Sequence, residues 1–151
     1  MKKILLENQN IYIIMYHYVQ ETKKSFFPKL KSLELNDFKS QISYFKSKAN
    51  ILNNDQFFEI LNTKKIPTKP SVILTFDDGY IDHYKYVFPL LNENKISGFF
   101  YPPIKTIEKR EVLDVNKIHL ILEKETNKKK ILDLITHHLK KDFDIEIEDL
   151  N

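Results

Sequence analysis

Continuous apolar runs alternate along this chain with stretches in which apolar positions recur every three or four residues. The runs at 11–16, 71–76 and 96–101 are rich in β-branched and aromatic residues. Such runs predict strands that are covered on both faces, as in a parallel sheet. A very short strand is expected at Ile51-Leu52.

The periodic stretches predict helices between these strands. The first helix is expected to start at Asn36, which can cap it, and the second at one of Asn53, Asn54 or Asp55. A third follows residue 80 and is kinked or broken by Pro89. The apolar stripes of the first and third helices are Leu35, Phe38, Ile42 and Phe45, and Tyr84, Val87, Phe88 and Leu91. Alternating strands and helices predict an α/β fold with three or four parallel strands.

From Asp114 onward the apolar stripes predict a pair of helices. Residues 19–33 have no clear period and predict a long loop, and 143–150 predict either an edge strand or a disordered tail. The length of 151 residues fits one domain. We therefore expect 1–151 to be a single domain, with its core at 11–103 and a helical extension at 114–141.

Composition narrows the classes of function. The chain has no cysteine, and its net charge of +3 comes from dispersed lysines and a single arginine, so no nucleic-acid partner is expected. The first apolar run, Ile4-Leu5-Leu6, is too short for a signal peptide. No run approaches the roughly 18 apolar residues of a membrane span. A cytoplasmic location without a membrane span is the default expectation.

The candidate chemistry lies at Asp77-Asp78-Gly79, directly after the second strong strand. Adjacent carboxylates serve one site only if the strand ends there and the backbone turns, and Gly79 gives that freedom. α/β enzymes place their sites at the carboxyl edge of the sheet. One carboxylate could then hold a divalent cation while the other takes a proton from water. The alternative is a simple turn in which Asp caps the next helix.

The sequence from Thr75 to Tyr80, Thr-Phe-Asp-Asp-Gly-Tyr, resembles the first motif of the polysaccharide deacetylases, carbohydrate esterase family 4. Tyr16-His17 resembles the Tyr-His pair of the subgroup that deacetylates poly-N-acetylglucosamine-type polymers. The resemblance runs from about Ile11 to Pro103. Further collinear matches are Phe38-Lys39-Ser40-Gln41-Ile42, Pro67, the 71–74 strand, Pro89-Leu90-Leu91 and Ile96-Ser97-Gly98-Phe99-Phe100.

The resemblance implies a partial (β/α) barrel with metal-dependent N-deacetylation of an amino-sugar glycan as its activity. Asp77 would be the general base and Asp78 a ligand of a divalent metal, most often zinc in such enzymes. His17 would line the site, with Gly79 and Tyr80 completing the turn. The implied partner is an N-acetylated glycan.

The chain departs from the family in lacking its His-(Ser/Thr)-x-x-His metal pair, and it contains no tryptophan. Zinc wants three or four protein ligands, so the site is expected to be completed by ligands that this chain lacks, for example from a second chain that supplies the rest of the barrel. Two alternatives stay open. One is a truncated, non-catalytic remnant or interaction module of the same fold. The other is a magnesium-binding or phosphate-processing α/β protein.

The other histidines and aromatic residues receive structural interpretations. His83 is expected to be exposed, and His119 to pack at an interface. His137 and His138 are adjacent near a helix end, so their side chains diverge and do not chelate. Most aromatic residues are expected in the core, with Tyr18 and Tyr101, at strand ends, as candidates for substrate contact.

Overall fold

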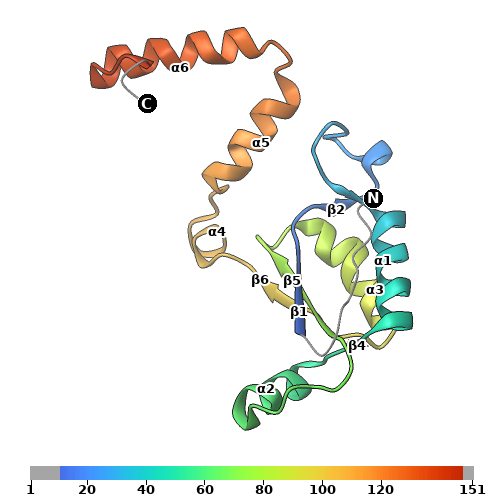
Figure 1. The fold of residues 1–151 in the computed structure, drawn as a ribbon. Helices are drawn as coiled ribbons and strands as arrows, with labels where there is room; N and C mark the ends of the chain where they lie inside the picture. The colour runs from blue at the N-terminus through green and yellow to red at the C-terminus, as the bar shows by residue number, and fades with distance from the viewer. Residues whose placement is uncertain (1–10, 148–151) are drawn as a thin grey trace. The chain divides into compact units, whose positions relative to one another are not determined.

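The computed structural model describes residues 11–147. Its contacts divide the chain into two compact units, Met1–Glu111 and Val112–Asn151. The first unit contains the sheet and the second contains two helices (Figure 1). The expected N-terminal apolar run and the end of the C-terminal tail, residues 148–150, lie outside the described residues.

Four parallel strands form the main sheet of the first unit. Strand β5 (Ser71–Asp77) pairs along one edge with β1 (Ile11–Tyr16). Along the other edge of β5, β4 (Asn50–Ile51) pairs with the beginning of the strand and β6 (Phe99–Tyr101) pairs with its end. This sheet confirms the predicted α/β class and its parallel strands, and it brings the carboxyl ends of β1, β5 and β6 to one edge (Figure 1).

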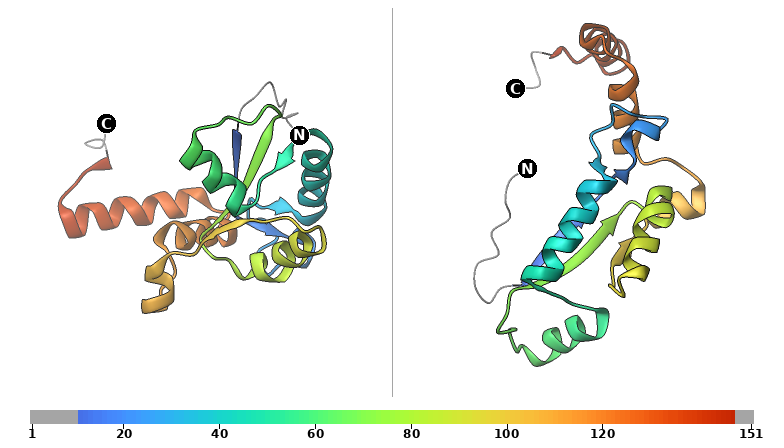
Figure 2. Two further views of the ribbon diagram at one scale, coloured as in Figure 1. Left: turned by 90° about the horizontal axis from the view of Figure 1, so that it is seen from below. Right: turned by 90° about the vertical axis from the view of Figure 1, so that its right-hand side faces the viewer.

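One face of the sheet packs against helices α1 (Leu35–Lys48) and α3 (Phe88–Glu93), as the views of Figure 2 show. Alternate residues of β5 point to this face, and the rings of Tyr16, Phe38 and Phe76 meet in its core at centroid distances of 5.0 to 6.0 Å. The buried apolar residues of this core are Tyr16, Val19, Leu35, Phe38, Ile42, Phe45, Val72, Leu74, Phe76, Val87 and Leu91.

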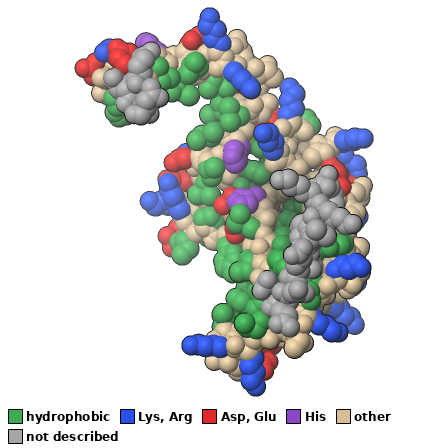
Figure 3. All heavy atoms as spheres, in the orientation of Figure 1, with side chains coloured by type: hydrophobic (Ala, Val, Ile, Leu, Met, Phe, Trp, Pro, Cys, Tyr) green, Lys and Arg blue, Asp and Glu red, His purple; other side chains and the backbone are tan. Residues whose placement is uncertain are grey.

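The opposite face of β1 corrects the expectation that this strand is covered on both sides. Ile13 and Met15 are each 62% exposed, although they lie in a continuous apolar run. Ile73, their neighbour on β5, is buried. Hydrophobic side chains therefore reach the surface of this unit, as the space-filling view shows (Figure 3).

Several element boundaries differ from the prediction. Helix α1 starts at Leu35 after Glu34, which makes no side-chain cap, so Asn36 lies in its first turn. Helix α2 (Asn54–Thr63) is capped by Asn53, the first of the three candidates, and Gln56 completes a capping box. The last strand is shorter than predicted and begins at Phe99.

The sequence did not predict four short elements of the first unit. The expected loop at 19–33 contains a pair of two-residue strands, β2 (Val19–Gln20) and β3 (Leu33–Glu34), and a 3₁₀ turn at Thr22–Lys24. Helix α4 (Ile104–Lys109) follows the Pro102-Pro103 pair. These elements are brief, and a period cannot be recognised over so few residues.

The predicted kink at Pro89 takes the form of a π-helical turn, His83–Val87, immediately before α3. The Phe88 N–H donates to the carbonyl of His83, five residues back. Proline has no N–H to donate and its ring clashes with a carbonyl in the preceding turn. The wider π turn accommodates this clash by inserting one extra residue.

The second unit is the predicted pair of helices, α5 (Asp114–Lys124) and α6 (Lys128–Phe143). Asn127 caps α6 by accepting a hydrogen bond from the Lys130 N–H. Beyond α6, residues 144–147 contain no strand. Across residues 11–147, no helix has the length and apolar character required to span a bilayer.

Candidate active site

Asp77 is the last residue of β5 and lies opposite the residue that follows β1. Because β1 and β5 run in parallel register to the Tyr16–Phe76 pair, His17 emerges beside Asp77. The His17 Nε2 lies 3.9 Å from the Asp77 Oδ2, and the two side chains are 44% and 28% exposed. This distance is too long for a direct hydrogen bond and lies within the range of an ion pair with a protonated imidazole.

The strand ends because the backbone turns into the left-handed region. Asp78 has φ +69° and Gly79 has φ +62°, so Asp78 does not continue the alternation of β5. Gly79 is also needed for space, since a Cβ at this position would lie 2.8 Å from the Cβ of Pro102. Two separate constraints therefore favour glycine at position 79, the positive φ and the close approach of Pro102.

Tyr80 contacts the carboxylate of Asp78, which lies in this turn. Its hydroxyl donates a 2.6 Å hydrogen bond to the Asp78 Oδ2, and its ring stacks on Tyr18 with centroids 4.2 Å apart. Burial and the hydrogen bonds to Asp78 and Tyr18 raise the pKa of Tyr80 far above its usual range. Tyr80 therefore remains a protonated donor, and it does more than complete the turn.

His83 is buried, which corrects the expectation that it is exposed. Only 3% of its surface is accessible, and its Nε2 lies 2.6 Å from the backbone oxygen of His17. Burial lowers its pKa, so the imidazole is neutral. A sequence signal for this burial exists: His83 lies four residues before Val87, on the same helical side as the apolar stripe.

The described residues do not by themselves fit a zinc ion. Between residues 11 and 147 there is no group of three or more histidine, aspartate or glutamate side chains placed to hold a metal. Zinc usually takes three or four protein ligands. Asp78 could supply one of them.

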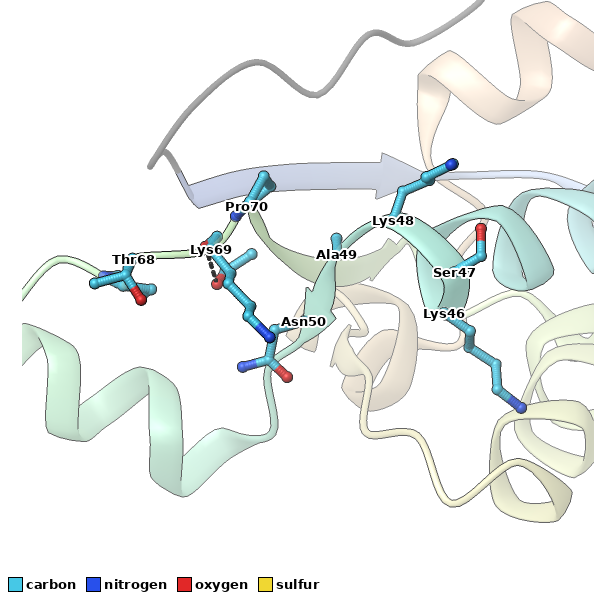
Figure 4. Close-up of a pocket in the computed structure, with 10 residues that line it drawn as sticks. Lys46, Ser47, Lys48, Ala49, Asn50, Thr68, Lys69 and Pro70 are labelled. Atoms are coloured by element: carbon cyan, nitrogen blue, oxygen red, sulfur yellow. Dashed lines mark hydrogen bonds between the residues drawn. The ribbon is translucent and has the colours of Figure 1, made fainter.

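A cavity of about 650 Å³ lies at the other end of the sheet (Figure 4). It is bordered by Pro70 and Ser71, where β5 begins, and by Lys46 and Lys48 at the end of α1. Cationic side chains are favourable near the carboxyl end of a helix, which accounts for these two lysines without a ligand. The cavity includes neither Asp77 nor Asp78 and is separate from the candidate site.

The fold and site thus define an α/β protein with paired carboxylates at the carboxyl edge of a parallel sheet. The model of the polysaccharide deacetylase family matches residues 64–138, which contain both carboxylates. Residues 64–138 are thus identified as a polysaccharide deacetylase domain, and this match supports a deacetylase-like function. No curated protein matches the chain.

Three solved structures are similar to this chain. A de-N-acetylase from Aggregatibacter actinomycetemcomitans is 28% identical with a TM-score of 0.49, and the match covers 61% of this chain and 37% of that one. IcaB from Ammonifex degensii is 21% identical with a TM-score of 0.52, covering 62% and 38%. The Streptococcus pyogenes deacetylase PplD, in complex with acetate, is 17% identical with a TM-score of 0.53, covering 93% and 71%. The chain thus spans less than two-fifths of the length of the first two.

Proposed function

We propose that this chain supplies the general base and one metal ligand of a deacetylase that acts on an N-acetylated amino-sugar polymer. The main support is the position of the Asp77 carboxylate. It is accessible, lies at the carboxyl edge of the sheet and has the His17 imidazole 3.9 Å away. The family match over residues 64–138 points to the same chemistry.

In this proposal Asp77 accepts a proton from a water molecule as the water oxygen attacks the acetamide carbonyl. The carbon–nitrogen bond then breaks as the nitrogen receives the proton that Asp77 took from the water. The products are acetate and the amine of the sugar, which takes up the proton that the acetic acid releases. His17 lines the site beside the base. Its Nε2 lies 3.9 Å from the Asp77 Oδ2, within the range of an ion pair.

Asp78 would be one ligand of a divalent cation, with zinc as the first candidate. The hydrogen bond from Tyr80 occupies one lone-pair site of this carboxylate and leaves others, since an ionised carboxylate has about four. Hydrogen-bonded partners commonly fix metal-binding carboxylates in this way. The remaining ligands would come from outside residues 11–147, and a second chain is one source.

Tyr101 is the residue best placed to touch the sugar. It pairs in register with Asp77 on the adjacent strand, and its side chain is exposed. Side chains at paired positions of neighbouring parallel strands point to the same face of the sheet. An exposed aromatic ring next to the base suits the apolar face of a sugar. Tyr18 is less available because its ring is stacked on Tyr80.

A non-catalytic module of the same fold is the second candidate. The observation that favours it is the lack of a three-residue metal cluster in the described part of the chain. The magnesium and phosphate alternative has no comparable support, since the matching family is that of the polysaccharide deacetylases.

Zinc titration of the chain by calorimetry tests the proposed function, with Asp78→Ala and Asp55→Ala compared side by side. Asp55 is an exposed carboxylate in the first turn of α2 and serves as the matched control. The proposal predicts weak zinc binding that Asp78→Ala abolishes and Asp55→Ala leaves intact. Zinc binding that survives Asp78→Ala would contradict it. Acetate release from an N-acetylglucosamine oligomer that is lost in Asp77→Asn would exclude the non-catalytic module.

A further inference from the structure

His83 lies in an aromatic cage directly behind the candidate site. The rings of Phe76 and Tyr80 are each 5.5 Å from its ring, centroid to centroid, and that of Phe100 is 6.1 Å away. All three contacts are edge-on, and the residue is 3% exposed. An apolar ring would satisfy such an environment without burying polar atoms. The packing alone therefore gives no reason for a histidine.

The two ring nitrogens of His83 have different surroundings. The Nε2 lies 2.6 Å from the backbone oxygen of His17, and since a carbonyl only accepts, the Nε2–H must donate. The Nδ1 is then an unprotonated acceptor, and it has no hydrogen-bond partner among the described residues. A buried polar atom without a hydrogen bond costs free energy. We therefore expect the hydrogen bond that the Nε2–H donates to provide a benefit that offsets the cost of the unpaired Nδ1.

The π turn explains how His83 reaches this position. It begins at His83 and inserts one extra residue before Pro89, which rotates the start of the helix relative to α3. Val87, at the other end of the turn, is fully buried in the main core. π turns of this kind occur frequently at functional sites.

The hydrogen bond joins two segments that are 66 residues apart in the sequence. It ties the residue after β1 to the helix that follows the Asp77-Asp78 turn. His17 is the first residue beyond the last β1–β5 pair, so the strand ladder does not hold its carbonyl. The same residue carries the imidazole that faces Asp77 at 3.9 Å.

We propose that His83 is a positioning residue, whose Nε2–H holds the carbonyl of His17 and so keeps the His17 imidazole against Asp77. The importance of this contact for catalysis rests on the proposed function. The contact itself does not, and it can be measured without turnover.

Three variants of the full chain separate positioning from simple packing. His83→Phe keeps the ring and removes the donor. His83→Gln places an amide N–H close to the position of the Nε2–H. Val87→Ala removes a fully buried side chain from the same turn and leaves the His83 hydrogen bond in place. It is the control for a general loss of stability.

Nuclear magnetic resonance of the labelled chain supplies two measurements. The first is the ¹³C shift of the His17 carbonyl, which reports the hydrogen bond that this carbonyl accepts. The second is the displacement of the His17 ring signals caused by Asp77→Asn, recorded in each of the three backgrounds and in the unaltered chain. This displacement reports the contact between the imidazole and the carboxylate.

The proposal predicts that His83→Phe moves the carbonyl signal upfield and abolishes the response of the His17 ring to Asp77→Asn. His83→Gln is expected to restore both, and Val87→Ala to preserve both while lowering the melting temperature. The proposal is overturned if the His17 ring responds equally in His83→Phe and in the unaltered chain. It is also overturned if Val87→Ala removes the response as fully as His83→Phe. A failure of zinc binding or acetate release would count against the proposed function and would leave these signals unchanged.

Discussion

The Tyr80 hydroxyl donates to the Oδ2 of Asp78, two residues before it, over 2.6 Å. Asp78 is a non-glycine residue with φ +69°, a conformation that costs free energy unless local contacts stabilise it. The Tyr80 ring is in turn fixed by stacking on Tyr18. The orientation of the proposed metal ligand therefore depends on a tyrosine pair within the same edge of the sheet.

Tyr80→Phe tests this dependence, because it keeps the stacked ring and removes only the hydroxyl. Loss of a hydrogen bond to a charged group is expected to lower the free energy of unfolding by about 1.5–3 kcal/mol. It should also weaken the predicted zinc binding by roughly 10- to 100-fold, the usual effect of losing such a partner. Calorimetry and urea unfolding measure the two effects. Tyr84→Phe, at an exposed position of the following turn, should change neither.

Gly79→Ala should destabilise the turn. A left-handed conformation costs an L-residue about 1–2 kcal/mol, and the new Cβ would also meet Pro102. Lys64 provides a control for which the opposite change in stability is expected. It is the exposed residue that caps the carboxyl end of α2, with φ +55°. Lys64→Gly should raise the free energy of unfolding by about 1 kcal/mol. Equal unfolding midpoints for Gly79→Ala and the unaltered chain would contradict this account of the turn.

The buried His83 predicts that stability depends on pH. Its pKa is lowered in the folded state, so the unfolded chain binds the proton more readily. The stability should be constant above the ordinary histidine pKa of 6.5 and fall as the pH drops below it. The charged and titratable groups around the ring are Asp82 and Asp78, which favour the proton, and His17, which opposes it.

Urea unfolding across this pH range, for the unaltered chain and for His83→Phe, measures the contribution of His83 directly. The difference between the two unfolding free energies should shift in favour of His83→Phe as the pH falls. A difference that is independent of pH would show that His83 is accessible to protons in the folded chain.

The core of the first unit should be far more sensitive than its surface aromatic residues. Phe38 is fully buried and contacts the rings of Tyr16 and Phe76, so Phe38→Ala should cost about 3–5 kcal/mol. Phe26 is 97% exposed, and Phe26→Ala should stay within about 0.5 kcal/mol. Thermal unfolding followed by circular dichroism compares the pair. Similar melting temperatures for both variants would contradict the assigned core.

The strongest sequence signals concern residues whose local pattern and tertiary environment agree. The apolar run that ends at Asp77 became the central strand, and α2 is capped by Asn53, one of the three predicted candidates. The exposure of Ile13 could not be predicted, because a continuous apolar run does not reveal which face another element covers. The burial of His83 was missed because its place after Asp82, in the first turn beyond the motif, favoured exposure, although its spacing to Val87 indicated the buried side of the helix.

In the candidate site too, the sequence predicts some features and misses others. The sequence predicts a turn at Gly79, and both Asp78 and Gly79 adopt positive φ there. The hydrogen bonds of Tyr80 and His83 join groups whose distances depend on the folded backbone, and spacing alone does not predict them. The roles of Asp77 as base and Asp78 as ligand remain predictions.

Acetate release by a hybrid enzyme tests those roles most directly. Residues 11–103 of this chain would replace the corresponding segment of the Streptococcus pyogenes deacetylase, whose fold is similar. We predict that the hybrid releases acetate from an N-acetylated amino-sugar oligomer, that Asp77→Asn abolishes this release, and that Asp55→Asn preserves it. A folded hybrid whose acetate release is unchanged by Asp77→Asn would contradict the central claim.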